Sequence, residues 1–122
     1  MNTDPASLTA RILSAHAHGT PLRIRGGGSK DFYGGALQGE LLDVSGYRGI
    51  VDYEPSELVL TARAGTPLVE IESTLAKHGQ MLAFEPPHFA DAATFGGCIA
   101  AGLSGPRRAS AGSARDFVLG VR

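Results

Sequence analysis

The sequence has little of several features that would indicate a specialised class of protein. Cysteine occurs once, as Cys98, which excludes an internal disulfide framework and favours a reducing compartment. The 11 basic and 12 acidic residues nearly cancel, and the arginines are scattered along the chain, so nothing indicates a nucleic-acid-binding surface. No pair of histidines or cysteines has the spacing of metal ligands, so no metal site is predicted.

Targeting and membrane signals are also missing from the sequence. The residues after Met1 form neither the basic segment nor the apolar segment of a signal peptide, and no apolar run approaches the roughly 20 residues that span a membrane. We therefore expect a cytoplasmic protein that does not insert into a membrane. The length of 122 residues predicts one compact domain.

Glycine, by contrast, is abundant, and the most informative of the 17 glycines follow a predicted strand. From Leu22 the chain alternates apolar and basic residues and then runs into Gly26, Gly27, Gly28 and Ser29. Because glycine has no Cβ, successive N–H groups can turn toward a ligand and approach it closely, and such concave runs bind phosphate. The sequence predicts a nucleotide or dinucleotide site here; the alternative is a flexible turn between two strands.

This glycine run differs from the two common phosphate-binding motifs. A P-loop places lysine between glycine and a Ser or Thr, whereas Ser29 here precedes Lys30. A dinucleotide-binding Rossmann motif opens directly into a helix, but residues 31–35 do not favour helix. A nucleoside triphosphatase and a Rossmann dehydrogenase are therefore disfavoured.

Capping residues and hydrophobic spacing predict two helices, over residues 5–18 and 67–78, each with a proline at its start and a glycine after its end. Alternation of apolar and polar residues predicts short strands. These lie at residues 22–26, 41–44, 49–53, 58–64 and 81–84. Prolines predict a hairpin turn over residues 54–57 and an extended backbone over residues 85–88.

Small residues dominate the second half of the sequence. Residues 92–102 have bulk only at Phe95 and Ile99, so we expect this backbone to pack closely against another part of the protein. Residues 116–122 are strongly apolar and are predicted to form a strand, which normally needs neighbours on both sides. We therefore expect the chain to be a piece of a longer protein; the alternative is a C-terminal strand that pairs back onto the sheet.

Two further groups of residues have both a structural and a binding interpretation. Thr94 with Gly96 and Gly97 is either a simple junction between a loop and a helix or a second contact to phosphate or flavin. Arg107 and Arg108 are either exposed charge or a contact to a carboxylate or phosphate.

Two residues that could serve as a base or a nucleophile have simpler interpretations. His88 is expected to be a solvated loop residue, since the sequence places no carboxylate or nucleophile near it. Cys98 is expected to be a small buried residue, as unpaired cysteines usually are. The sequence therefore leaves the catalytic residues unknown.

The order of several short motifs resembles the FAD-binding domain of the vanillyl-alcohol oxidase and p-cresol methylhydroxylase family of flavoproteins. The resemblance covers almost the whole chain and is carried by residues 25–29, 42–45, 59–67, 93–100 and 115–120. Other details look most like the FAD-binding subunits of bacterial glycolate oxidases. These details are at residues 48–51, 79–82, 85–88 and 105–108.

The resemblance implies an α+β fold of two subdomains with FAD between them. Residues 1–88 would form the first subdomain, a small mixed sheet with flanking helices, and residues 89–122 would begin the second. The residues implied to line the pyrophosphate are Gly26, Gly27, Gly28, Ser29 and Lys30. Those implied to lie near the flavin and its ribityl chain are Pro86, Pro87, Thr94, Gly96 and Gly97, and further carried-over cofactor residues are Ala100, Gly102, Gly105 and Arg107. FAD would be bound non-covalently, because Ser29 stands where members that attach FAD covalently often have histidine.

The same resemblance implies a subunit of an FAD-dependent oxidoreductase that oxidises glycolate to glyoxylate by hydride transfer to flavin N5. Its partners would be the other glycolate oxidase subunits, peripheral at the inner membrane, and a small hydroxy-acid substrate. The family's substrate-binding residues come mostly from parts not present here, so this chain alone is expected to be inactive and to bind FAD weakly at best. The alternatives are a non-enzymatic scaffold subunit with the same fold, or the FAD domain of a different 2-hydroxy-acid dehydrogenase or a molybdenum hydroxylase.

Overall fold

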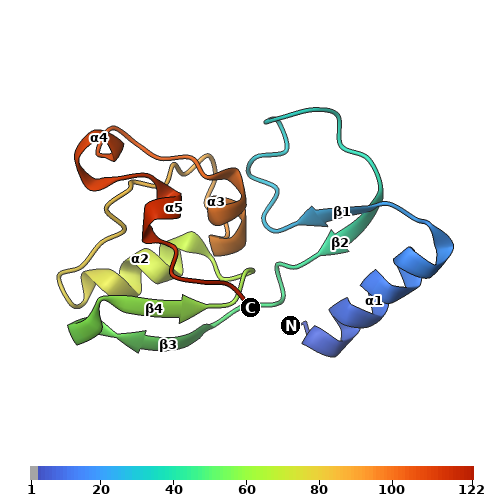
Figure 1. Ribbon diagram of the computed structural model, residues 1–122, viewed down its shortest axis with the longest axis horizontal. Coiled ribbons are helices and arrows are strands. Elements are labelled where there is room, and N and C mark those ends of the chain that lie inside the picture. Colours follow the sequence, from blue (N-terminus) through green and yellow to red (C-terminus); the bar gives the residue numbers. More distant parts are fainter. Residues whose placement is uncertain (1–2) are drawn as a thin grey trace.

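The computed structural model describes residues 3–122, which form short helices and small sheets (Figure 1). In chain order the elements are α1 (Pro5–His18), β1 (Leu22–Arg25), β2 (Glu40–Asp43), β3 (Ile50–Glu54), the 3₁₀ turn η1 (Pro55–Glu57), β4 (Val59–Ala62), α2 (Leu68–Ala76), α3 (Phe95–Ala101), α4 (Arg108–Ala111) and α5 (Ala114–Phe117). This mixture confirms the predicted α+β class. Within the described residues, no helix has the length and apolar character needed to cross a bilayer.

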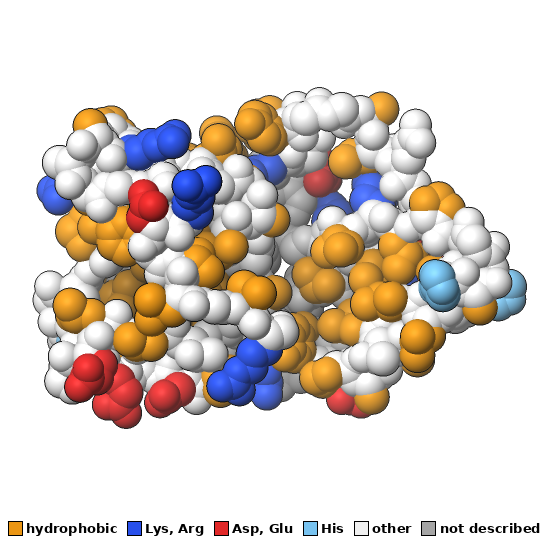
Figure 2. All heavy atoms as spheres, viewed as in Figure 1, with side chains coloured by type: hydrophobic (Ala, Val, Ile, Leu, Met, Phe, Trp, Pro, Cys, Tyr) orange, Lys and Arg blue, Asp and Glu red, His pale blue; other side chains and the backbone are white. Residues whose placement is uncertain are grey.

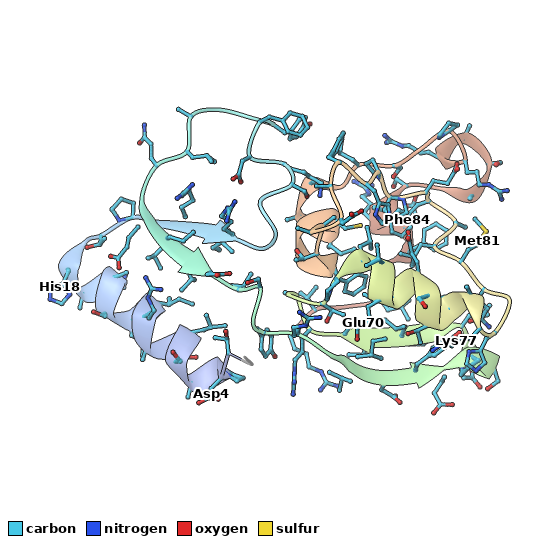
Figure 3. The ribbon with its side chains drawn as sticks, turned by 180° about the vertical axis from the view of Figure 1, so that it is seen from behind. Asp4, His18, Glu70, Lys77, Met81 and Phe84 are labelled. Carbon is cyan, nitrogen blue, oxygen red and sulfur yellow. The ribbon has the colours of Figure 1, made fainter. Side chains whose placement is uncertain are left out.

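The first helix begins and ends where its capping residues predict. The Asp4 side chain accepts a hydrogen bond from the N–H of Ala6, and Pro5 occupies the first helical position. Gly19 ends the helix with a left-handed φ of 64°. Figure 3 shows Asp4 and His18 at opposite ends of α1. The predicted helix over residues 5–18 is confirmed.

The strands form two separate two-stranded sheets. β3 and β4 pair antiparallel around η1, which confirms the predicted hairpin. β1 and β2 pair in parallel, with Leu22 opposite Glu40 and Arg25 opposite Asp43. A parallel pair needs a long connection because the chain must return to the same end. Here that connection is the segment over residues 26–39, which begins with the glycines.

The molecule has two parts with the glycine segment between them (Figure 1). α1, β1 and β2 make one part, and the hairpin with the other helices makes the second. Beyond β1, the chain turns toward α3 of the second part. Figure 2 shows the surface hollowed between the two parts, and orange apolar side chains gathered over the α1, β1 and β2 part. Among the exposed residues of that part are Ile12, Leu13 and Ile24.

The hydrophobic core lies in the second part, where α2, α3 and α5 meet. Its buried members are Leu68, Phe84, Ala93, Cys98 and Ala114, and Leu82 and Phe95 pack against them. These residues come from both sides of residue 88, and the division into subdomains at that residue stays a proposal. Ala93 links the core to the segment over residues 26–39, because its neighbours Ala92 and Thr94 lie against the glycines of that segment.

The predicted strand over residues 81–84 is wrong. That segment follows the end of α2 without regular structure, and the N–H of Glu85 closes a turn onto the carbonyl of Leu82 (3.1 Å). The preceding residue Gln80 is held by side-chain hydrogen bonds instead: it accepts from Tyr53 Oη (2.6 Å) and donates to the carbonyl of Pro55 (2.8 Å). These bonds fix the segment against the hairpin without forming a ladder.

The predicted extended backbone over residues 85–88 is also wrong at its first residue. Glu85 has a φ of 51°, in the left-handed region that residues other than glycine rarely adopt. The N–H of Arg107 donates to Glu85 Oε1 (2.6 Å), and the N–H of Gly105 donates to the carbonyl of Phe84 (3.0 Å). These two contacts from the later part of the chain hold the strained turn.

The strand predicted over residues 116–122 is replaced by the short helix α5 and a segment without regular structure. Ser113 and Asp116 form a capping box: the Asp116 carboxylate accepts from both the N–H (2.8 Å) and the hydroxyl (2.9 Å) of Ser113. The N–H of Ser113, and to a smaller extent its hydroxyl, stabilise the ionised carboxylate and so lower the pKa of Asp116. The box starts a helix where apolar content alone predicted a strand.

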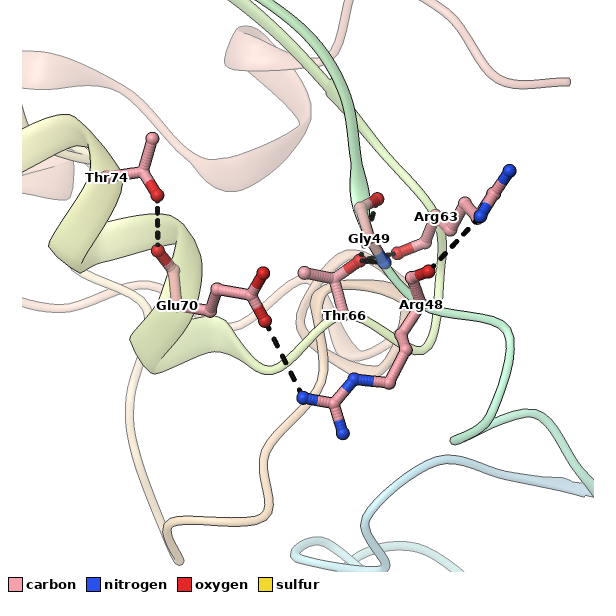
Figure 4. A network of polar contacts seen from close by, with 6 residues as sticks. All are labelled: Arg48, Gly49, Arg63, Thr66, Glu70 and Thr74. Carbon is pink, nitrogen blue, oxygen red and sulfur yellow. Dashed lines mark hydrogen bonds and ion pairs between the residues drawn. The ribbon is translucent and has the colours of Figure 1, made fainter. Parts of the chain in front are cut away.

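A buried threonine joins the β3–β4 hairpin to the start of α2 (Figure 4). Thr66 Oγ1 accepts from the N–H of Gly49 (2.9 Å) and lies within hydrogen-bond distance of the carbonyls of Arg63 (2.7 Å) and Gly49 (3.2 Å). Outside this buried centre, the ion pair between Arg48 and Glu70 (3.7 Å) makes a second link. The hydroxyl therefore satisfies backbone groups from two separate segments.

Replacing Thr66 by valine is expected to destabilise the fold by about 1–3 kcal/mol, because the N–H of Gly49 loses its acceptor in a buried place. Denaturant unfolding of the purified protein measures this change. Thr66→Ser is the control, since it keeps the hydroxyl and removes one methyl group. If Thr66→Ser and Thr66→Val lower the free energy of unfolding by the same amount, the hydroxyl contributes nothing to stability.

Candidate cofactor site

The glycine loop (residues 26–30) lies against the segment that leads into α3. A Cβ on Gly26 would overlap the Thr94 side chain, and a Cβ on Gly27 would overlap the carbonyl oxygen of Ala92. Gly28 has a φ of 71° and also lies against the guanidinium of Arg25. Gly26 and Gly27 are therefore needed for close approach and Gly28 for its left-handed backbone, and the flexible-turn interpretation does not explain such tight contacts.

The backbone N–H groups of the glycine loop are available to a ligand. No carbonyl or side-chain oxygen in the described part of the chain accepts a hydrogen bond from an N–H of residues 26–30. The bonds that do form lie around them: the N–H of Asp31 donates to the carbonyl of Gly28 (3.2 Å), and the N–H of Tyr33 to that of Lys30 (2.9 Å). A run of unpaired N–H groups is expected to find an acceptor, and an anion is the natural one.

Lys30 adds a positive charge to this place. A Cβ built on Gly97, in the first turn of α3, would be 3.9 Å from Lys30 Nζ, so the ammonium group lies beside that turn. Across residues 3–122, Lys30 has no carboxylate within ion-pair distance. The structure thus brings together the predicted residues of the glycine loop with Thr94 and Gly97.

The N-terminal N–H groups of α3 are, in contrast, already satisfied by the protein. Those of Phe95, Gly96, Gly97 and Cys98 donate, in that order, to the carbonyl of Thr66 (2.8 Å), the carbonyl of Ala64 (2.8 Å), Thr94 Oγ1 (3.2 Å) and the carbonyl of Thr94 (2.9 Å). A Cβ on Gly96 would be 2.8 Å from the Cβ of Ala64, so this glycine allows α3 to pack on the hairpin. This confirms the expected close packing of the small-residue segment. It leaves these residues no free backbone N–H for phosphate.

The other predicted cofactor residues lie in two further places. Pro86 is buried and Pro87 half-buried after the strained Glu85, and a Cβ on Gly105 would be 2.8 Å from the Cβ of Glu85. Arg107 is exposed and reaches Glu85 only through its N–H. Ala100 and Gly102 are exposed at the far end of α3. Their roles in cofactor binding stay predictions.

Cys98 has no nucleophilic character in this structure. The side chain is buried in the core, and burial raises the pKa of its thiol to about 11. The charge of Lys30 lowers this pKa by a smaller amount. At neutral pH the group is therefore an uncharged thiol, which agrees with the expected small buried residue.

His88 has a carboxylate partner that the sequence did not reveal. Its Nε2 lies 2.9 Å from Glu72 Oε2 and 3.0 Å from Glu72 Oε1, and both side chains are partly exposed. Glu72 lies on α2, far from His88 along the chain, and no motif links the two positions. The pair ties the segment before α3 to α2.

Two cavities lie outside this region. One of about 370 Å³ is lined by Arg108, Gly112, Ser113, Arg115 and Asp116. Another of about 270 Å³ is lined by Arg11, Ser14, Ala15, His18, Thr20 and Glu40. Arg108, a candidate contact to a carboxylate or phosphate, lines the first cavity, but neither cavity is lined by a residue that the resemblance assigns to FAD. The case for the glycine loop therefore rests on its backbone donors.

Comparisons with known proteins identify the family to which the chain is similar. The sequence pattern of a family described as "FAD binding domain" matches residues 2–122. The chain is 54% identical over 116 residues to the glycolate oxidase subunit GlcE of Escherichia coli (strain K12), over 95% of this chain and 33% of that protein. The chain thus spans about a third of the length of this curated relative. No solved structure matches it. The two matches confirm the resemblance to FAD-binding domains.

Proposed function

Because the chain belongs to the FAD binding domain family, whose cofactor is FAD, we propose that it is the FAD-holding part of an oxidoreductase that oxidises a small 2-hydroxy acid, with glycolate as the substrate. When bound, FAD supplies the hydride acceptor for this chemistry. The chain's own residues bind the cofactor and orient it. The alternatives remain a scaffold subunit without cofactor and a domain that serves another hydroxy acid.

The observation that carries this proposal is the set of unpaired N–H groups in the glycine loop. A diphosphate offers several acceptor oxygens and negative charge, and the loop offers successive N–H donors with Lys30 beside them. Close contacts of Gly26 with Thr94 and of Gly27 with Ala92 leave no room for side chains that would shield these donors. We therefore assign the diphosphate of FAD to residues 26–30.

The remaining cofactor residues are proposed to lie toward the flavin and its ribityl chain. Thr94 is buried beside Gly26, so its position next to the loop supports this role. Pro86 and Pro87 follow the strained Glu85, which is held from the α4 side of the molecule. Ser29 leaves the loop without a histidine, so we propose that FAD is not covalently attached.

We propose that the chain works in a complex with other subunits, as the name of its relative indicates for that protein. We also propose a cytoplasmic location, with the complex peripheral at the inner membrane. The proposed substrate-binding residues lie outside this chain, so the isolated chain is proposed to be inactive.

Replacing Lys30 by glutamate is expected to weaken FAD binding at least about tenfold, equivalent to about 1.4 kcal/mol. The reason is that the substitution places a negative charge beside the donors for the diphosphate. Titration of the purified protein with FAD, followed by flavin fluorescence, measures the dissociation constant. Equal dissociation constants for this variant and the parent protein would remove the loop assignment.

Lys77→Glu is the matched control for this experiment. Lys77 is exposed, and Figure 3 shows it at the opposite end of α2 from Glu70. It undergoes the same change of charge, so it reports any general effect of net charge on an anionic cofactor. Denaturing the FAD-loaded protein and recovering free FAD from the supernatant tests the non-covalent attachment in the same preparation.

A chimaera tests the proposed activity. The matching segment of the E. coli glycolate oxidase subunit is replaced by this chain, and the assembled complex is assayed for FAD content and glycolate oxidation. An active yellow complex supports the proposal, whereas an assembled colourless complex that FAD cannot reconstitute favours the scaffold alternative. Assays of the protein's own complex with glycolate, D-lactate and purines then distinguish the substrate alternatives.

A further inference from the structure

An ion pair closes the two ends of the glycine loop. Arg25, the last residue of β1, donates from Nε to Oδ2 of Asp31 at 3.2 Å, and both side chains are 41% exposed. The residues between them are those whose N–H groups are unpaired. The guanidinium lies directly against Gly28, the residue with the left-handed φ. The ion pair therefore joins the two ends of the loop on the side of Gly28, where the backbone turns.

Both ends of this pair are also anchored by the backbone. The carbonyl of Arg25 accepts from the N–H of Val44 (2.9 Å), which fixes it to the chain beyond β2. The N–H of Asp31 donates to the carbonyl of Gly28 (3.2 Å), which closes a turn inside the loop. Consecutive glycines lose more conformational freedom on ordering than other residues, so they hold a fixed curvature only with such constraints.

We propose that Arg25 and Asp31 form a brace that fixes the curvature of the glycine loop and so prepares its N–H groups for the diphosphate. This proposal rests on the assignment of the loop to FAD. Holding a loop in its bound conformation raises affinity because less ordering remains to be done on binding. Both members are positioning residues, since each is argued to act through the loop backbone.

The direction in which Asp31→Ala changes FAD affinity distinguishes the brace from a simple effect of charge. Asp31 carries a negative charge near the proposed diphosphate, and like charges repel. If charge alone mattered, Asp31→Ala would tighten FAD binding. The brace predicts the opposite, because without Asp31 the guanidinium of Arg25 loses its partner and the loop is released.

The experiment measures FAD affinity for four variants of the purified protein by flavin fluorescence. Asp31→Ala and Arg25→Gln are each expected to weaken binding about tenfold, and the double variant no more than Arg25→Gln alone, because the second change finds the brace already broken. Glu40→Ala is the matched control. It removes one carboxylate from the ion pair with Arg11 (3.0 Å), which joins α1 to β2 away from the loop. Its FAD affinity is expected to be unchanged.

A second measurement reports on the loop itself. Amide hydrogen exchange at residues 26–30, without FAD, is expected to be faster in Asp31→Ala than in the parent and unchanged in Glu40→Ala. Thermal unfolding shows that the variants are folded, since half-exposed ion pairs contribute little to stability. Weaker FAD binding without faster exchange would overturn the brace.

The outcomes also separate this proposal from the function on which it rests. If Lys30→Glu weakens FAD binding and Asp31→Ala leaves it equal or tighter, the brace is overturned and the site stands. If Lys30→Glu and both single brace variants leave the dissociation constant unchanged, the loop does not hold the diphosphate and both proposals fall.

Discussion

Replacing Gly27 by alanine is expected to lower stability by about 3 kcal/mol and to abolish FAD binding. The added Cβ would overlap the carbonyl oxygen of Ala92, a backbone atom that cannot rotate away. Either the glycine loop or the segment before α3 must move, and each carries proposed cofactor residues. Thermal unfolding, with an expected fall in Tm of roughly 10 °C, and FAD titration measure the two effects.

Gly35→Ala is the matched control for that substitution. Gly35 lies in the same connection between β1 and β2, its φ is not positive, and an added Cβ would meet no atom within 4 Å. Its effect on stability is expected to stay within about 0.5 kcal/mol. If Gly27→Ala lowers stability no more than Gly35→Ala does, the close approach of Gly27 to Ala92 does not contribute to stability. The argument that the loop is tightly packed would then fail.

Local signals predicted those parts of the fold whose structure is decided locally. Asp4, Pro5 and Gly19 determine α1 because capping bonds form between near neighbours in the chain. The hairpin between β3 and β4 was predicted for the same reason, since Pro55 fixes the turn between two alternating strands. Strand β4 is shorter than predicted, because only Val59–Ala62 of the predicted residues 58–64 forms the strand.

Other parts depend on contacts between distant segments and could not be predicted. The left-handed Glu85 is held by Gly105 and Arg107, about twenty residues later, and no local rule anticipates that bond. The segment over residues 116–122 was assigned by its apolar content, but the polar pair Ser113 and Asp116 decides the helix. That capping spacing was present in the sequence and could have been used.

The sequence predicted part of the geometry of the candidate site, and the binding role of that site stays a prediction. Glycines after a strand predicted an anion-binding loop, and the unpaired N–H groups agree with it. What could not be predicted is which backbone each glycine meets, such as Ala92 opposite Gly27, or that α3 already uses its own N–H groups. Glycine pairs near helix starts are therefore ambiguous, because close packing and anion binding demand the same residue.

Replacing Phe84 by alanine is expected to destabilise the protein by about 3–5 kcal/mol, because the ring is only 2% exposed and fills the centre of the core. Denaturant unfolding should show a lower midpoint with an unchanged m-value. Phe32→Ala is the control: that ring is 69% exposed and contacts mainly the exposed Phe89, with ring centroids 5.1 Å apart, so its loss should cost about 1 kcal/mol or less.

The Phe84→Ala substitution is expected to alter the cofactor site as well, because Ala93 connects the core to that site. That residue packs in the same core cluster, and its neighbours Ala92 and Thr94 form the surface on which the glycine loop rests. If the folded Phe84→Ala protein keeps the native site, FAD should still bind it and stabilise it. At 100 times its dissociation constant, FAD should raise the free energy of unfolding of this variant by about 2.7 kcal/mol. A folded variant that FAD does not stabilise would show that the core determines the site's geometry as well as its stability. Equal losses for Phe84→Ala and Phe32→Ala would contradict the central place of Phe84 in the core.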